Sequence, residues 1–293
     1  MSIDTATSAY HFTIGDIACS IISDGSLAYA DPAHLFFVNA PNAERDRALR
    51  TAGIEPDTWH EYVSPHCALL VETGGQRILV DAGGGGFVPS DGRLHDNLRG
   101  EGIALDSINV VILTHAHADH VGGILDAAHR PAFPHARFVL WREEWDFWTG
   151  PADLSHLPLP EQSKAALVAL AKRSLLPIEG QVDLIDEDTT VAPGVQIIAA
   201  PGHTPGHTAV LVSSGSDQLL WSGDAILHPF NIRRPGWYST FDLDPNKAVT
   251  TRRALLARAG DEGILLHATH FPWPGLGHVA RQNDRFLWEP VKS

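Results

Sequence analysis

Four side chains able to bind a divalent metal lie within six positions of the sequence. They are His115, His117, Asp119 and His120, in the run His-Ala-His-Ala-Asp-His. If an extended backbone continues to His117, residues two apart point the same way, so His115 and His117 face one point. Asp119 and His120 then begin a helix, expected over residues 121–128, and face a second point. Imidazoles and carboxylates are ligands that zinc accepts, with cobalt, manganese and iron as alternatives.

Three further candidate ligands, His203, Asp224 and His270, each follow an apolar run expected to be a strand. Loops at the edge of a rigid sheet are where many folds place their reactive groups, so these positions suit a shared site. His207 follows His203 by four residues. We expect it to buttress the turn or to orient a ligand rather than to bind metal, because such outer contacts are typical of metal sites.

The elements that would carry these residues are strands and helices in two sets. Strands are predicted at residues 11–22, 67–73, 76–81, 109–114, 137–140, 195–200, 208–213, 218–222 and 263–266. Helices are predicted at residues 141–148, 161–173 and 246–259. The proline-rich residues 151–160 predict a surface loop or lid. This order indicates a four-layer α/β fold, αββα, formed by a single domain over residues 1–293 with two similar halves.

Composition excludes several classes of protein. The chain carries 35 acidic and 21 Lys+Arg residues, a net charge of −14, which opposes binding to nucleic-acid phosphates. No apolar stretch is long enough to span a membrane. Residues 1–16 lack the cationic start and apolar run of a signal peptide, which predicts a cytoplasmic protein. The two cysteines, Cys19 and Cys67, are too few for a disulfide framework and are expected to be buried.

The ligand motifs resemble those of the metallo-β-lactamase fold superfamily of hydrolases, and the resemblance covers nearly the whole chain. It implies two packed β-sheets flanked by helices, with two divalent metal ions, zinc foremost, at their common edge. The ligands it implies are His115, His117 and His203 for one ion, Asp119, His120 and His270 for the other, and Asp224 bridging both. Asp81 resembles the structural aspartate that the superfamily places near this site.

Differences between this sequence and other branches of the superfamily narrow the set of branches that it resembles. Neither cysteine lies near a ligand motif, unlike in true β-lactamases, and His117 stands where flavin-linked di-iron members carry Glu. The charge opposes the nuclease branches, and the basic C-terminal glutathione site of glyoxalase II is not found. Residues 270–278 and 286–290 are most similar to the methyl parathion hydrolase-like group, on the lactonase and organophosphate-hydrolase side of the superfamily.

The resemblance implies that a hydroxide held between the two metals attacks a small apolar ester, lactone or phosphotriester. Asp119 is also a candidate to pass a proton to the leaving group. Two alternatives stay open: a dedicated acyl-homoserine lactone lactonase, and a metal-bearing binding module without turnover. The expected partner is a small molecule, and because relatives are often dimers, a homodimer is expected from the resemblance alone.

An apolar cleft with few polar anchors is expected beside the metals, as small-molecule sites usually are. The aromatic candidates for its wall are Trp145, Trp148, Phe230, Trp237, Phe271 and Trp273, and the polar candidates are His278, His228 and Arg233. Core packing is the alternative, expected for about half of the aromatics. The four glycines at 83–86 either allow a substrate or a neighbouring loop to approach closely or form a flexible turn.

Overall fold

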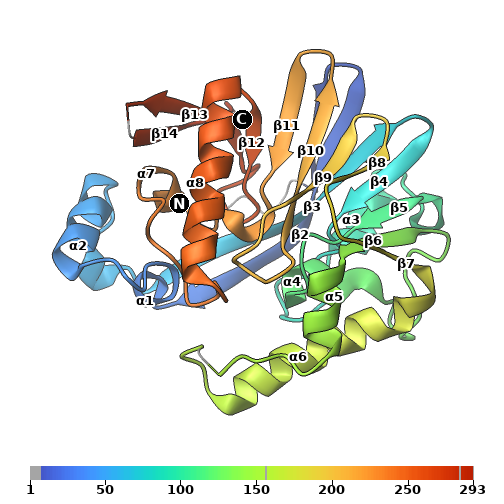
Figure 1. Ribbon diagram of the computed structural model, residues 1–293, viewed down its shortest axis with the longest axis horizontal. Coiled ribbons are helices and arrows are strands. Elements are labelled where there is room, and N and C mark those ends of the chain that lie inside the picture. The colour runs from blue at the N-terminus through green and yellow to red at the C-terminus, as the bar shows by residue number, and fades with distance from the viewer. Residues whose placement is uncertain (1–7, 156, 284, 293) are drawn as a thin grey trace.

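Two seven-stranded sheets pack face to face in the computed structural model, which describes residues 8–155, 157–283 and 285–292, and helices cover both outer faces (Figure 1). This architecture confirms the predicted four-layer αββα fold. In each sheet the strands neighbour one another in chain order, so each half of the chain forms one sheet. Residues 1–7, on which part of the signal-peptide prediction depends, lie outside the described residues.

The first sheet begins as an antiparallel meander and continues with parallel strands after its fourth member. Its strands are β1 (Ala9–Ile14), β2 (Ile17–Ala30), β3 (Glu61–Thr73), β4 (Gln76–Val80), β5 (Val110–Ile112), β6 (Arg137–Trp141) and β7 (Val182–Ile185). The single strand predicted over residues 11–22 is wrong. Gly15, with a φ of 53°, turns the chain there, and β1 and β2 pair as a hairpin instead.

The second sheet is antiparallel except where β11 and β12 run side by side in the same direction. Its strands are β8 (Thr189–Ala192), β9 (Val195–Ala199), β10 (Thr208–Ser214), β11 (Asp217–Trp221), β12 (Leu265–His267), β13 (Leu276–Gln282) and β14 (Arg285–Pro290). The hairpin of β13 and β14 was not predicted, because polar residues interrupt both strands. No helix in the described part of the chain is long and apolar enough to cross a membrane.

The helices are α1 (Pro32–Phe36), α2 (Asn42–Thr51), α3 (Leu94–Gly100), α4 (Ala118–Val121), α5 (Arg142–Thr149), α6 (Glu161–Leu175), α7 (Phe230–Arg233) and α8 (Pro245–Glu262). The predicted helices that became α5, α6 and α8 are confirmed. The helix predicted over residues 121–128 is wrong, because α4 ends at Val121. Gly122 packs so closely on the loop after β4 that a Cβ there would lie 2.1 Å from the carbonyl oxygen of Gly84.

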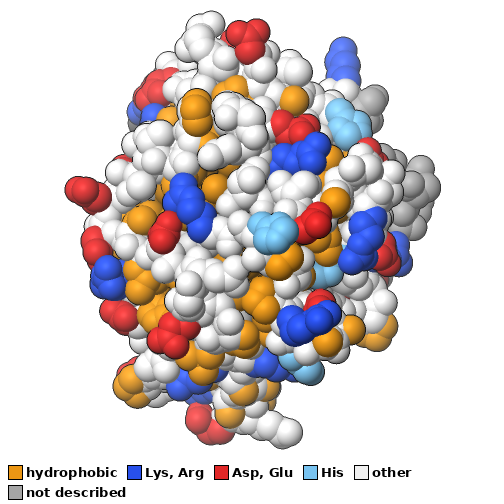
Figure 2. Space-filling model, turned by 90° about the vertical axis from the view of Figure 1, so that its right-hand side faces the viewer, with side chains coloured by type: hydrophobic (Ala, Val, Ile, Leu, Met, Phe, Trp, Pro, Cys, Tyr) orange, Lys and Arg blue, Asp and Glu red, His pale blue; other side chains and the backbone are white. Residues whose placement is uncertain are grey.

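Apolar side chains from both sheets fill the space between them, including Ile21, Leu69 and Val80 from the first and Val195, Val210 and Trp221 from the second. α8 packs on the outer face of the second sheet through Leu255 and Leu256. These layers fix the edge at which parallel strands β4, β5, β11 and β12 end. On the face drawn in Figure 2, acidic and basic side chains are interspersed rather than gathered by sign.

Candidate metal centre

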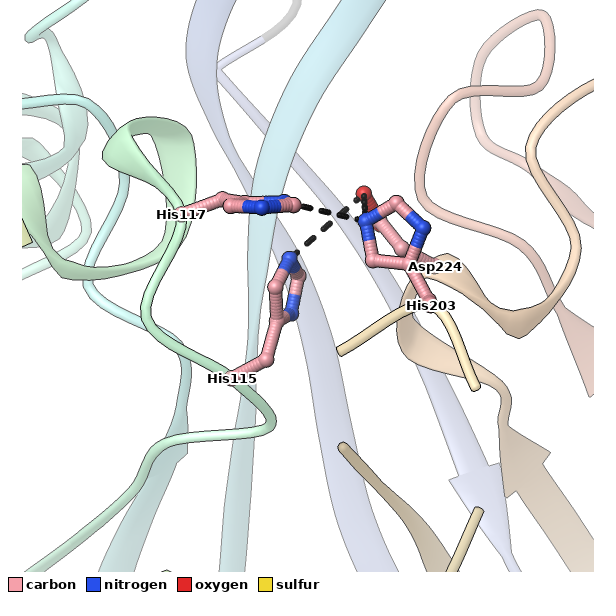
Figure 3. A group of neighbouring side chains, drawn as sticks. All are labelled: His115, His117, His203 and Asp224. Carbon is pink, nitrogen blue, oxygen red and sulfur yellow. Dashed lines mark hydrogen bonds and ion pairs between the residues drawn. The ribbon is translucent and has the colours of Figure 1, made fainter. Parts of the chain in front are cut away.

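His115 and His117 lie on the loop after β5, His203 and Asp224 lie on the segments after β9 and β11, and the four side chains point at one another (Figure 3). The Asp224 Oδ2 atom lies 3.4 Å from Nε2 of His203 and 3.7 Å from Nε2 of His115. His117 Nδ1 lies 3.0 Å from His203 Nε2. One ligand atom of each residue lies within 4.8 Å of the others, so the four residues could hold one metal ion.

A second group adjoins the first and shares Asp224 with it. Nε2 of His120 and of His270 lie 3.6 Å and 3.5 Å from Asp119 Oδ2. The same two nitrogens lie 3.2 Å from Asp224 Oδ1 and 3.0 Å from Asp224 Oδ2. The structure therefore brings all seven predicted ligands together, in two groups that meet at Asp224.

These groups fit two metal ions. His115 Nε2, His120 Nε2 and Asp224 Oδ1 are buried and have no hydrogen-bond partner among the described residues. An unsatisfied buried polar atom costs about 1–3 kcal/mol, and bound cations would satisfy all three of these atoms. Burial lowers the pKa of His117 to about 3 and that of His115 well below its usual range, which leaves both imidazoles neutral and able to bind metal.

The carboxylates are also in the state that a metal needs. Burial raises the pKa of Asp119, but the imidazoles of His120, His66 and His270 outweigh it and bring that pKa to about 2. Burial raises the pKa of Asp224 as well, but His270 and His120 outweigh this effect and hold that pKa well below the usual value of an aspartate. Both side chains are therefore anionic at neutral pH.

Asp81 and His207 position the candidate ligands. Asp81 is buried with a φ of 66°; its Oδ2 accepts from His120 Nδ1 at 2.8 Å, and its Oδ1 accepts from the backbone N–H and hydroxyl of Thr114. His207 donates from Nδ1 to the Ala200 carbonyl at 3.0 Å, and its Nε2 accepts from the Asp224 N–H at 2.9 Å. Neither nitrogen of His207 is free for metal, so it orients the backbone of Asp224.

Two partners of the ligand histidines were missed by the sequence analysis. Asp242 Oδ1 accepts from His203 Nδ1 at 2.9 Å, while its Oδ2 pairs with buried Arg252 at 3.3 Å. The hydroxyl of Ser64 lies 2.8 Å from His270 Nδ1. Asp242 lies in the segment 241–245 beside other acidic and aromatic residues, but nothing in its spacing marks it as a partner of His203.

Glu144 joins the loops of the two halves of the chain and was also missed. Its buried carboxylate accepts from the Ala116 N–H, the Trp148 indole, the Thr204 hydroxyl and the Gly206 N–H at 2.7–3.0 Å. Four donors satisfy this charge without a cation. Glu144 thereby fixes the loop of His117 relative to the turn that carries His203.

A cavity of about 340 Å³ opens over the two groups, and its wall is mainly apolar. α6 contributes Leu167 and Leu170, and the loop before it contributes Leu157 and Leu159. The described residues 151–155 and 157–160 form no helix or strand, which confirms the loop predicted there. The wall is completed by aromatic side chains from the first sheet and from segments beyond it, Tyr29, Phe36 and Phe241 among them.

Only Trp148, among the aromatic residues predicted to line a cleft, lies on the wall of this cavity. The prediction is wrong for the other five. Trp145 packs against the first-sheet core, Phe230 and Trp237 against Phe36 and Phe37, Phe271 against Trp288, and Trp273 against the core between the sheets. Trp237 and Phe271 are buried in these clusters and Trp145, Phe230 and Trp273 are half-buried, so each of the five packs against other apolar side chains rather than at the cavity.

The three polar candidates also lie away from the cavity wall. His278 is exposed, because its neighbours on β13, Gly277 and Val279, face inward and alternate residues of a strand point to opposite sides. Arg233 is exposed at the end of α7. His228 is buried among aromatic rings, where burial lowers its pKa to about 3. Of the glycines at 83–86, the first three allow close approach, because a Cβ on any of them would lie 2.2–2.5 Å from a neighbouring side chain or loop, whereas a Cβ on Gly86 would meet nothing within 4 Å.

The known families and proteins that are similar to this chain include metallo-hydrolases. The sequence profile described as Metallo-beta-lactamase superfamily matches residues 62–270. The probable metallo-hydrolase YflN of Bacillus subtilis (strain 168) is 33% identical over 162 residues, 51% of this chain and 55% of that protein. An N-acyl homoserine lactonase of a Bacillus sp is 26% identical over 231 residues, 72% of this chain and 82% of that protein. The chain spans 55–57% of the length of YflN and two mycobacterial probable metallo-hydrolases.

Two solved structures are similar to this chain over nearly its whole length. The dizinc quorum-quenching lactonase AidC matches with a TM-score of 0.90 at 26% identity, over 99% of both chains. The hydrolase AbOPH, of the beta lactamase superfamily, matches with a TM-score of 0.88 at 25% identity, again over 99% of both chains. The family profile covers most of the sequence, including all seven candidate ligands. This chain therefore belongs to the metallo-beta-lactamase superfamily.

Proposed function

We propose that this protein is a dinuclear zinc hydrolase that opens lactones and cleaves related small esters with an apolar acyl group. The observation that carries the proposal is the full set of seven ligands beneath an apolar cavity. Five imidazoles and two carboxylates suit zinc, with cobalt, manganese or iron as substitutes. When bound, the two ions would supply a hydroxide nucleophile at neutral pH and polarise the ester carbonyl.

The cavity wall favours a neutral substrate with a hydrocarbon chain. None of the described residues that line it is Lys or Arg, and leucines of α6 and of the loop before it form one side. Each methylene that a substrate buries there contributes about 0.8 kcal/mol to binding. An acyl chain can therefore be held by contact alone, and the resemblance of the fold to a lactonase, AidC, supports a lactone as the reacting group.

Tyr29 is the group on the wall best placed to bind a substrate oxygen. Its ring packs edge-on against Phe36 and Phe241, and its hydroxyl makes no hydrogen bond to any described residue. Burial, together with the charges of Asp119 and Asp224, raises its pKa well above 10, so the hydroxyl keeps its proton at neutral pH. We assign it the role of donor to the carbonyl oxygen, where negative charge develops during attack.

Asp119 is assigned the transfer of a proton to the leaving oxygen. It lines the cavity, and its side chain is 15% exposed, compared with 4% for Asp224. Imidazoles keep it anionic, so it can accept a proton from the attacking water and release it to the leaving alkoxide.

A panel of substrates tests the proposal. Acyl-homoserine lactones of several chain lengths, a nitrophenyl ester and a nitrophenyl phosphotriester would be assayed before chelation, after it, and after addition of zinc. We expect lactones to give the highest kcat/KM, with activity lost on chelation and restored by zinc. Asp119→Asn should lose most activity, whereas exposed Asp217→Asn should not.

Other outcomes separate the alternatives. Faster turnover of the phosphotriester would make the protein an organophosphate hydrolase, and comparable rates on aryl esters would make it a general esterase. Tight retention of a lactone without product, shown by mass spectrometry, would indicate a binding module. Turnover that survives complete removal of metal would contradict the proposal itself.

A further inference from the structure

A third group of ligand-type side chains lies beside the proposed dinuclear centre and contributes no ligand to it. It comprises Asp24 of β2, His66 of β3 and Asp91 of the loop between β4 and α3, with one ligand atom of each within 4.8 Å of the others. All three are buried: the side chains of His66 and Asp91 are 1% and 0% exposed. No lysine or arginine contacts these two carboxylates among the described residues. Two buried carboxylates without a cation are costly.

The imidazole of His66 is aimed into this group without completing a hydrogen bond. Its Nδ1 lies 3.6 Å from Asp91 Oδ2, and its Nε2 lies 3.5 Å from Asp119 Oδ2. Both nitrogens and Asp91 Oδ2 are buried without a hydrogen-bond partner among the described residues. Hydrogen bonds between N–H and oxygen are usually 2.7–3.2 Å long, so these gaps are too wide for them.

Two classes of spacing between imidazole and carboxylate occur around the neighbouring centre. Pairs that only orient a ligand, His120 with Asp81 and His203 with Asp242, are 2.8 Å and 2.9 Å apart. Pairs proposed to share a metal ion lie 3.0–3.7 Å apart. The His66–Asp91 distance of 3.6 Å falls in the second class. This class is the longer one because two ligands that are each about 2.1 Å from one ion lie farther apart than the two atoms of a hydrogen bond.

The loop around the group is shaped to hold the two carboxylates. A Cβ on Gly83 would lie 2.5 Å from the Asp24 carboxyl carbon, and a Cβ on Gly84 would lie 2.2 Å from Asp91 Oδ2. Asp24 accepts from the Gly84 and Leu94 N–H groups at 2.7 Å and 2.8 Å, and Asp91 Oδ1 accepts weakly from the Val88 N–H at 3.3 Å. Backbone donors therefore bind both oxygens of Asp24 and one oxygen of Asp91, and they leave Asp91 Oδ2 directed at His66.

We propose that Asp24, His66 and Asp91 form a third divalent-cation site, separate from the dinuclear centre. One imidazole and two carboxylates suit a manganese, iron(II) or zinc ion, whereas calcium prefers six to eight oxygen ligands. With Nδ1 on the ion, His66 would present its Nε2 to Asp119 Oδ2, now 3.5 Å away, and a shift of about 0.3 Å would bring the two atoms into hydrogen-bond range. The third ion would then fix the orientation of a ligand of the dinuclear centre.

Metal stoichiometry tests this inference. The protein would be loaded with Mn²⁺ or Zn²⁺, desalted and analysed by mass spectrometry, alongside Asp91→Asn and the control Asp96→Asn, which changes an exposed carboxylate paired with Arg99. The unmodified protein and the control should each bind one equivalent more than Asp91→Asn. Equal metal content in all three would overturn the site.

Anomalous diffraction from crystals of the unmodified protein decides the matter even if Asp91→Asn does not fold. Data collected at the manganese edge should show a peak within about 2.0–2.3 Å of His66 Nδ1. Ordinary density without anomalous signal at that point would identify a water molecule and reject the inference. Peaks at the dinuclear centre are read separately, so failure of one site leaves the test of the other intact.

Discussion

In the candidate metal centre, each imidazole that faces Asp224 makes a polar contact through its other ring nitrogen, whereas the leucines that wall the cavity above are placed by packing alone. Thr114, Asp81, Asp242 and Ser64 contact the far nitrogens of His115, His120, His203 and His270. The cavity leucines have no comparable constraint. Directional polar contacts hold the candidate ligands in position, whereas an apolar wall can change its shape without disturbing them. Mutations of the candidate ligands and their partners should therefore change metal binding and activity, whereas mutations of the cavity wall should change substrate preference.

Removing the shared carboxylate should have the largest effect. Asp224→Asn takes away the charge that faces four imidazoles, so we expect kcat/KM to fall on the order of 10³-fold, beyond the 10–100-fold typical of outer contacts. Metal content should fall with it. Steady-state kinetics with metal analysis would check both. Retention of full activity by Asp224→Asn would contradict the proposed centre.

Weakening one outer contact should cost less. Asp242→Asn removes the carboxylate behind His203, and we expect a 10–100-fold loss of metal affinity or activity. Competition with a chelator would measure the affinity. Because the change also breaks a buried pair with Arg252, unfolding must be followed in parallel. Ser64→Ala, which removes a neutral partner of His270, should give a smaller loss. Equal losses in the two variants would show that charge behind the ligand is unimportant.

A change in the cavity wall should alter substrate preference and leave the chemistry intact. Leu167→Trp fills part of the cavity, so we expect KM for long-chain lactones to rise about 10-fold, with short-chain lactones little affected. Metal content should not change. The control is Leu176→Ala, just beyond the same helix, where the side chain is 49% exposed. A uniform fall in kcat for all chain lengths would place Leu167 in the catalytic machinery and end the distinction between the regions.

An aromatic residue outside the wall should affect stability only. Trp237→Leu leaves a void beside Phe37, and we expect a loss of about 1–3 kcal/mol in the free energy of unfolding, with chain-length preference unchanged. Thermal or denaturant unfolding beside the lactone panel would check this. A shift in chain-length preference would mean that the aromatic cluster of Phe36, Phe37 and Trp237 moves with the cavity.

The same contrast explains how far the sequence could predict the structure. The ligands could be found because they follow buried apolar runs, and strand ends place them at one edge. The resemblance to a known superfamily added the division into two groups. The cavity wall could not be predicted, because a large apolar side chain looks alike in the sequence whether it faces substrate or core. Tyr29 and His66 depend on the long β2–β3 pairing, whose bulge near Ser23 and Gly25 leaves no clear periodic signal.

The central claim is that seven side chains from both halves of the chain bind two metal ions. Crystals grown with zinc and measured at the zinc edge test it most directly. We predict two anomalous peaks roughly 3.5–4 Å apart. One should be ligated by His115, His117 and His203, the other by Asp119, His120 and His270, with Asp224 reaching both. Absence of both peaks, or zinc bound elsewhere while these side chains keep their positions, would contradict the account.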